Sequence, residues 1–159
     1  VLSHDIPDER SIKLENFLPH IDNKNFLAVN IKSVEIESEL KRILSESQIS
    51  NYFTFDWPTP SLTKALNCDL NCAFRLSEYE KYIFPKCEWA WIDSFDKIWY
   101  DADFLLSLKK SGIKLALVSP ELHRRSISNK NFFKRTQDFL DTYYDAGQIY
   151  LSHQNFDFQ

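Results

Sequence analysis

Side chains able to do chemistry lie at or just after the end of each of the short apolar runs in this sequence. They carry imidazole, carboxylate, hydroxyl, amide, ammonium or guanidinium groups, which transfer protons or bind charged ligands. An arginine in such a position can contact a phosphate through two parallel N–H bonds. The groups are, in chain order, His4 and Asp5; Asn30 and Lys32; Asp56; Arg75 with Glu78; Asp93; Ser119 with Glu121 and His123; and Ser152 with His153.

The apolar runs that end at these groups predict strands. They are nearly continuous rather than alternating, which is typical of strands buried on both faces of a parallel sheet. Most are separated by segments whose apolar residues have helical spacing. The expected strands span residues 1–4, 26–31, 52–55, 72–76, 89–92, 115–118 and 149–151, and the expected helices span 11–18, 34–47, 60–66, 77–83, 101–111 and 129–144.

The alternation of strands and helices predicts an α/β fold with a parallel sheet. Two architectures fit it, an open doubly wound sheet and a (β/α)8 barrel of the TIM type. In a barrel, the active groups gather at the carboxyl ends of all the strands, whereas an open sheet concentrates them at one switch point. Polar groups at every expected strand end favour the barrel. The seven strand units found in residues 1–159 make it a single, incomplete barrel domain without its first unit.

Composition limits the classes of function. A net charge of −4 argues against nucleic acid as a partner, and no apolar run is long enough to span a membrane. The two glycines exclude a glycine-rich phosphate loop. The spacing of Cys68, Cys72 and Cys87 does not match a structural zinc site, so we expect reduced thiols and a cytoplasmic protein.

Two expected strand ends carry short motifs that can be compared with known protein families. Residues 1–5 end in His4-Asp5, and residues 28–32 end in Ile31-Lys32. These ends resemble the second and third strands of glycerophosphodiester phosphodiesterases and related phosphatidylinositol-specific phospholipase C-like barrels. Residues 51–56, 115–119 and the segment ending at His153 resemble later strands of that family more weakly.

The resemblance implies metal-assisted acid–base hydrolysis of a small phosphodiester. His4 would be the retained catalytic histidine, and Asp5 and Asn30 would occupy metal-ligand positions for Mg²⁺ or Ca²⁺. The side chains expected to bind substrate are Lys32, Arg75, Trp91 and Asp93. We expect the strands to bring His4, Lys32 and Arg75 together around one shared binding site at the rim of the barrel.

This sequence also departs from the family pattern. The His-Arg-Gly motif of the family's first strand and the following Glu-x-Asp pair are not found, and Asn30 stands where the family has a glutamate. Either an upstream segment supplies these groups, or the chain is a degenerate relative that binds without cleaving. An incomplete barrel has an open edge, which an upstream segment or a second copy of the chain could cover.

Simpler interpretations stand beside the catalytic one. His4 could be an ordinary loop histidine, Lys32 an exposed lysine, and Arg75 the partner of Glu78 or Glu80 in a local ion pair. Asp56 and Asp93 could cap the segments that follow them. A third functional hypothesis is a phosphatase resembling the haloacid dehalogenase group, with its nucleophile at the end of residues 53–56 and its second motif at 112–119. Its second aspartate is replaced by Pro58.

Overall fold

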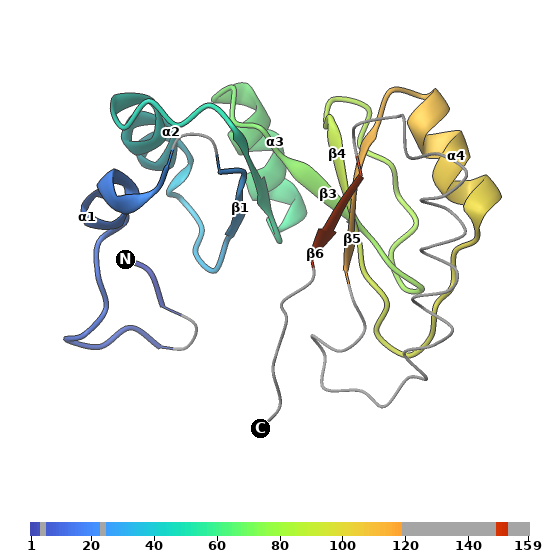
Figure 1. The fold of residues 1–159 in the computed structure, drawn as a ribbon, viewed down its shortest axis with the longest axis horizontal. Coiled ribbons are helices and arrows are strands. Elements are labelled where there is room, and N and C mark those ends of the chain that lie inside the picture. The colour runs from blue at the N-terminus through green and yellow to red at the C-terminus, as the bar shows by residue number, and fades with distance from the viewer. Residues whose placement is uncertain (4–5, 23–24, 119–148, 153–159) are drawn as a thin grey trace. The chain divides into compact units, whose positions relative to one another are not determined.

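A computed structural model describes residues 1–159 apart from 4–5, 23–24, 119–148 and 153–159. The chain divides into two compact units, Val1–Asn71 and Cys72–Gln159. Parallel strands and helices occur in both units (Figure 1). The expected single domain over residues 1–159 remains a prediction.

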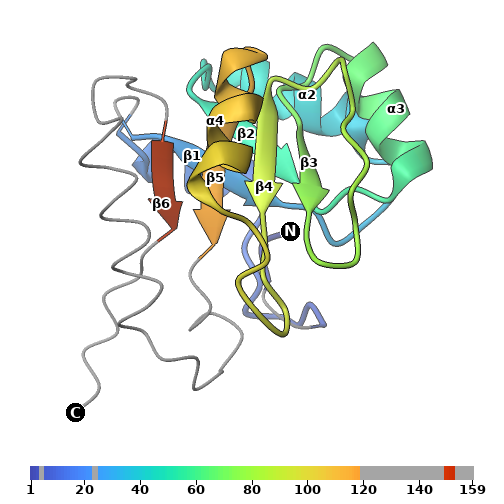
Figure 2. The ribbon, with the colours of Figure 1, turned by 90° about the vertical axis from the view of Figure 1, so that its right-hand side faces the viewer.

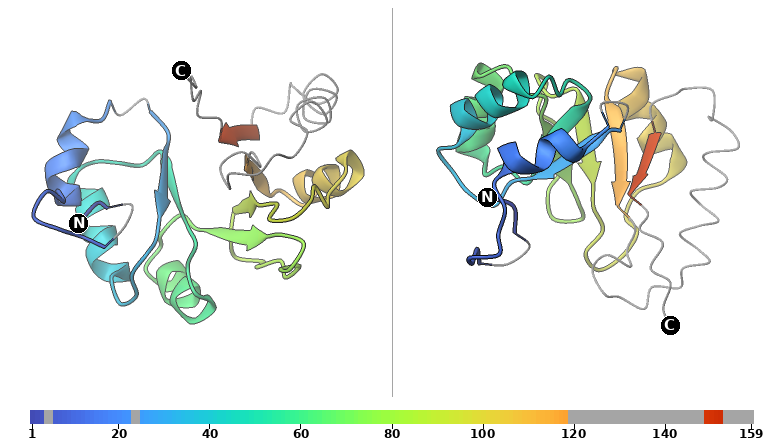
Figure 3. Two further views of the ribbon diagram at one scale, coloured as in Figure 1. Left: turned by 90° about the horizontal axis from the view of Figure 1, so that it is seen from below. Right: turned by 60° about the vertical axis from the view of Figure 1, so that its left-hand side comes forward.

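The first unit is built around two parallel strands. Leu27 is in register with Tyr52, and the pairing continues to Asn30 and Phe55. Helices α2 and α3 lie next to each other beside these strands (Figure 3). The elements are α1 (Leu14–Phe17), the 3₁₀ helix η1 (Leu18–His20), β1 (Leu27–Asn30), α2 (Glu37–Glu46), β2 (Tyr52–Phe55) and α3 (Thr59–Asn67).

The second unit is a parallel sheet of strand order β3-β4-β5-β6. Helix α4 packs against β5 (Figure 2). Its start is defined by Asp101, whose side chain accepts a hydrogen bond of 2.9 Å from the N–H of Phe104. The helix is followed by Gly112 at a φ of +82°, a backbone conformation that glycine adopts without strain. The elements are β3 (Ala73–Leu76), β4 (Trp89–Ile92), α4 (Ala102–Lys110), β5 (Lys114–Val118) and β6 (Ile149–Ser152).

Burial follows the expectation from the continuous apolar runs in β2 and β4 but not in β1. Every residue of β2 and of β4 is buried, as is typical of strands covered on both faces. By contrast, β1 alternates between half-buried and exposed residues. Among the described residues, no helix is both long and apolar enough to cross a membrane.

The predicted barrel is wrong. The described strands form two separate parallel sheets, one of β1-β2 and one of β3-β4-β5-β6, and no barrel is closed. The error has a physical cause. A strand of any parallel sheet runs into a surface loop, and surface loops are polar in open sheets and barrels alike. Polar groups at every strand end therefore do not distinguish the two architectures.

Two further elements differ from expectation. Of the strand expected at residues 1–4, the described residues 1–3 form no parallel strand; Leu2 makes an isolated antiparallel bridge with Ile12. Residues 77–83 form no helix, because the Ser77 hydroxyl accepts the N–H groups of Tyr79 and Glu80 at 3.2 and 3.1 Å. Such side-chain bonds satisfy the backbone in a turn and compete with helix formation. The helix expected at 129–144 lies outside the described residues.

Candidate functional site

The carboxyl ends of β3 and β4 place three of the predicted substrate-binding residues on one face of the sheet. Arg75 is in register with Trp91. The N–H of Asp93 donates to the carbonyl of Leu76 at 2.8 Å, which continues this pairing beyond the last strand residue. Residues in register share a face of a parallel sheet, and residues two apart on one strand share it too. Arg75, Trp91 and Asp93 therefore lie on a common face.

The guanidinium of Arg75 is held by a carboxylate. Its Nε donates to Glu80 Oε2 at 2.5 Å, and its Nη2 donates to Glu80 Oε1 at 3.1 Å. The same guanidinium lies 5.6 Å from the centre of the Phe95 ring. This two-bond geometry is the one that arginine also uses with phosphate. The ion pair expected for Arg75 is thus present with Glu80, and a phosphate at Arg75 would compete with that carboxylate.

Glu78 lies in the same turn but binds backbone instead of arginine. Its Oε2 accepts the N–H of Phe95 at 3.0 Å, and its Oε1 accepts the N–H groups of Lys97, at 3.2 Å, and Asp96. Partial burial opposes ionisation of this carboxyl. The backbone N–H groups, with Asp96 and Phe95 foremost, outweigh that effect and lower the pKa of Glu78 to about 2. Glu78 is therefore a carboxylate throughout the neutral range.

Asp93 and Trp91 form the buried part of this edge. Asp93 is only 4% exposed, and its Oδ1 accepts the N–H of Ser94 at 2.8 Å. The indole N–H of Trp99 donates to the carbonyl of Asp93 at 2.7 Å. Trp91 is buried as well. The edge thus combines a cation, a buried carboxylate and an apolar wall.

An open pocket of about 690 Å³ adjoins Glu78, and residues 96–99 contribute to its lining. The ammonium of Lys81 lies 3.3 Å from the centre of the Trp99 ring, within range of a cation–π contact. Desolvation lowers the pKa of Lys81, as does the nearby charge of Lys97, while the Glu78 carboxylate opposes the shift. The pocket therefore has cationic and aromatic side chains beside two carboxylates, those of Glu78 and Asp96.

The first unit brings together a different pair of predicted residues. Asn30 Nδ2 donates to Asp56 Oδ2 at 3.1 Å, where β1 and β2 end. Asp56 has a φ of +65°, and the start of α3 shows no side-chain cap, so the expected capping role of Asp56 is not observed. Lys32 follows β1 and is exposed. His4 and Asp5 lie outside the described residues.

The side chains of the described residues do not by themselves fit a divalent cation. Among the residues that the structure describes, no three His, Cys, Asp or Glu side chains gather in a way that could hold a metal ion. The Asn30–Asp56 pair supplies side-chain oxygens from only two residues, whereas Ca²⁺ takes about six to eight oxygen ligands. We therefore derive no catalytic step through a metal.

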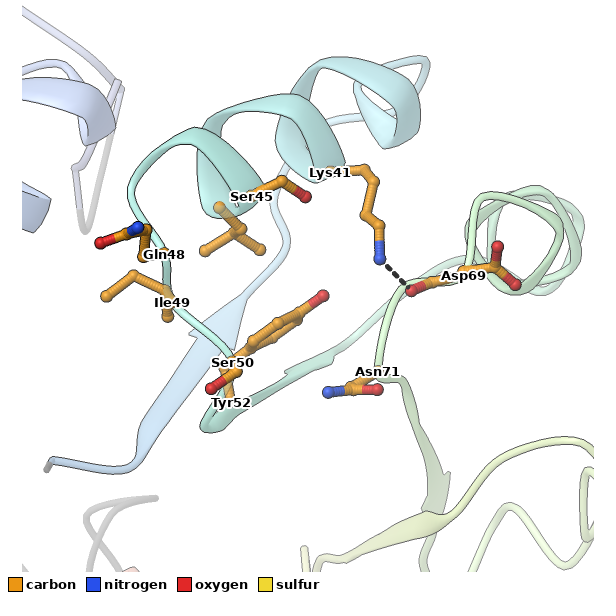
Figure 4. Close-up of a pocket in the computed structure, with 9 residues that line it drawn as sticks. Lys41, Ser45, Gln48, Ile49, Ser50, Tyr52, Asp69 and Asn71 are labelled. Atoms are coloured by element: carbon orange, nitrogen blue, oxygen red, sulfur yellow. Dashed lines mark hydrogen bonds between the residues drawn. The ribbon is translucent and has the colours of Figure 1, made fainter. Parts of the chain in front are cut away.

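A second pocket lies in the first unit, at the amino end of β2, away from the strand ends that carry Asn30 and Asp56. It has a volume of about 330 Å³ and is lined by residues of α2, the start of β2 and the segment after α3. The ammonium of Lys41 donates to the carbonyl of Asp69 at 2.7 Å (Figure 4). Active groups of parallel sheets lie at the carboxyl ends of strands, so this pocket at the amino end of β2 is the weaker candidate.

Sequence reasoning missed the part that backbone plays in this site. It paired Glu78 and Glu80 with Arg75 as possible ion-pair partners, and only Glu80 is one. Nothing in residue types reveals that Glu78 binds the N–H groups of residues 95–97, since every residue except proline offers an N–H. Lys32 and Arg75 belong to different compact units, so their expected convergence with His4 remains a prediction.

Comparison of the chain with protein-family models, with curated proteins and with solved structures finds no match. The resemblance to glycerophosphodiester phosphodiesterases therefore rests on the short motifs alone. The function has to be argued from the geometry of the site.

Proposed function

We propose that the chain is a hydrolase domain acting on a small phosphodiester of the glycerophosphodiester type, which binds at the carboxyl edge of β3 and β4. The observation that supports this is the common face of Arg75, Trp91 and Asp93. A glycerophosphodiester has an anionic phosphate, apolar carbons and free hydroxyls. A guanidinium, an indole and a carboxylate complement these three features in turn.

Each residue has a separate role in this proposal. The guanidinium of Arg75 binds two phosphate oxygens through a fork of two parallel N–H bonds, and it stabilises the negative charge that develops on them during cleavage. Trp91 packs against the carbons of the alcohol portion, and Asp93 accepts a hydrogen bond from one of its hydroxyls. Water is the nucleophile, and its bond to phosphorus forms as the bond from phosphorus to the alcohol oxygen breaks. His4 is proposed as the acid or base in the transfer of a proton from water to the departing alkoxide.

The decisive experiment measures release of glycerol phosphate from a glycerophosphodiester, with Mg²⁺ or Ca²⁺ present. Arg75→Lys keeps the charge but loses the two-bond fork, so we expect KM to rise by about tenfold or more. Arg42→Lys is the matched control, because Arg42 makes a similar fork with Glu39 on α2. His4→Ala should abolish turnover.

Three results would contradict the proposal: no cleavage by the wild-type chain, an unchanged KM in Arg75→Lys, or full turnover in His4→Ala. Binding of the phosphodiester without cleavage would instead support the second candidate, a non-catalytic binding module. That candidate is favoured by Asn30, which stands where the resembled family has a metal-binding glutamate.

The cysteines support a cytoplasmic location as part of this proposal. Cys68, Cys72 and Cys87 are free thiols, and the last two are buried. Free buried thiols are typical of proteins kept in a reducing compartment. A small-molecule phosphodiester from the cytoplasm is the partner that this location implies.

A further inference from the structure

Three consecutive backbone N–H groups converge on one carboxylate after β4. They belong to residues 95–97, and their common acceptor is the side chain of Glu78. Successive N–H groups that point to one spot form a concave anion site, which elsewhere in proteins holds phosphate. In this structure the chain supplies the anion itself.

The surroundings of this site favour a ligand with more negative charge than one carboxylate. Lys81 and Lys97 are close enough to Glu78 and to each other to shift the pKa of Lys81, and both line the adjoining pocket. Asp96 is the opposing charge, and its carboxylate accepts a hydrogen bond from the hydroxyl of Tyr79. Removing the Glu78 carboxylate would leave Lys81, Lys97 and Asp96 as the charged side chains that line the pocket.

The turn that carries Glu78 also carries Glu80, the partner of Arg75. The turn is closed by Ser77, whose hydroxyl accepts the N–H of Glu80 at 3.1 Å and whose N–H donates to the carbonyl of Glu80 at 2.9 Å. A displacement of this one turn would therefore free both the Arg75 guanidinium and the N–H groups of residues 95–97.

We propose that the N–H groups of residues 95–97 form a phosphate-binding site, and that the turn at 77–80 blocks it by placing Glu78 in the position of the phosphate. The choice of phosphate rests on the proposed function. A bound phosphodiester displaces Glu78 from the N–H groups and Glu80 from Arg75, so the substrate itself opens its site. The same two glutamates keep other weakly binding anions out.

The test is a titration of the full chain with inorganic phosphate, followed by the amide NMR signals of Phe95, Asp96 and Lys97. In Glu78→Ala the N–H groups lose their internal acceptor, and we expect phosphate to shift these three signals with an affinity about tenfold or more above that of the wild type. Glu78→Gln keeps the shape of the side chain without its charge, and its affinity should fall between the two.

Glu88→Ala is the matched control, because it removes one exposed carboxylate of the same unit that pairs with Lys114. It should leave phosphate affinity at the wild-type level. Equal affinities in the wild type, Glu78→Ala and Glu78→Gln would overturn the proposal, as would an equal gain in Glu88→Ala. The readout needs no turnover. Phosphate binding at residues 95–97 without cleavage of a phosphodiester would refute the proposed hydrolysis and support this site. Cleavage without phosphate binding at residues 95–97 would support the hydrolysis and refute this site.

Discussion

The carboxyl ends of the strands look alike in sequence in the two compact units, but they differ in what holds their polar groups. In the first unit, Asn30 donates a hydrogen bond of 3.1 Å to Asp56 across the two strand ends. In the second unit, a long segment between β3 and β4 turns back and places Glu80 on Arg75 and Glu78 on backbone N–H groups.

The lengths of the connections account for this difference. Only three residues separate β2 from α3, whereas β3 and β4 are joined by residues 77–88 without a helix. A long connection costs entropy to order, and the turn at Ser77 and the bonds of Glu78 offset that cost. The long segment that returns to the carboxyl ends of β3 and β4 thus adds two fixed carboxylates, Glu78 and Glu80, which the short connection after β2 does not provide.

The largest expected contrast between the units concerns their thiols. Cys68 of the first unit is half-buried, whereas burial, with a smaller effect of Cys72, raises the pKa of Cys87 to about 12. At pH 8 only about one Cys87 in ten thousand is a thiolate. We expect iodoacetamide to modify Cys68 about a hundredfold or more faster than Cys87, as measured by mass spectrometry of digested protein.

Alkylation in denaturant is the control, and there all the cysteines should react at similar rates. Equal modification of Cys68 and Cys87 in the folded protein would show that the interior of the second unit is open to reagent.

The next contrast is in stability. Leu115 of β5 is fully buried between two neighbouring strands, whereas Leu27 of β1 is half-buried on a strand that pairs only with β2 among the described strands. The same substitution can therefore be compared at a central and an edge strand. Leu115→Ala should lower the free energy of unfolding by about 2–5 kcal/mol. Leu27→Ala should lower the free energy of unfolding by about 1 kcal/mol, because folding removes less apolar surface from water at this half-buried position.

Urea unfolding of both variants measures this difference. A larger loss in Leu27→Ala than in Leu115→Ala would reverse the assignment of the two strands to edge and centre.

The smallest contrast concerns the contribution of Glu78 to stability. The pKa of its carboxyl falls from an ordinary value of 4.5 to about 2 in the folded protein. A lowered folded-state pKa stabilises the fold above the unfolded value, and this contribution disappears as the pH falls through the folded value. Glu78→Gln should therefore cost about 1 kcal/mol at pH 7 and almost nothing at pH 2.

Thermal or urea unfolding at several pH values measures the effect, with Glu88→Gln as a variant of an exposed carboxylate. A difference between wild type and Glu78→Gln that stayed constant from pH 7 to pH 2 would mean that the carboxylate charge contributes nothing through the N–H groups.

Much of the local structure could be predicted from the sequence. The strands at 52–55 and 89–92 match β2 and β4 residue for residue, because continuous apolar, β-branched and aromatic runs are typical of buried strands. The helix expected at 101–111 contains α4, since Asp101 and Gly112 mark its two ends. The helix expected at 77–83 failed, because side-chain bonds from Ser77 satisfy backbone that a helix would otherwise use.

The candidate site was predictable only in part. Arg75, Trp91 and Asp93 could be named because polar groups after buried strands of one direction share an edge. Their common face depends on the register between β3 and β4, which the sequence of either strand alone does not specify. The bond from Arg75 to Glu80 depends on how the segment after β3 folds back. The site at residues 95–97 could not be named, because its donors are backbone groups.

The sequence by itself determined where the buried strands β2 and β4 and the capped helix α4 form, because hydrophobic patterning and capping act within a few residues of one another. Only the tertiary structure decided that the strands form two sheets instead of a barrel, and that Glu78 and Glu80 bind different partners. These outcomes depend on contacts between residues distant in the chain, and their geometry follows from strand pairing and loop closure.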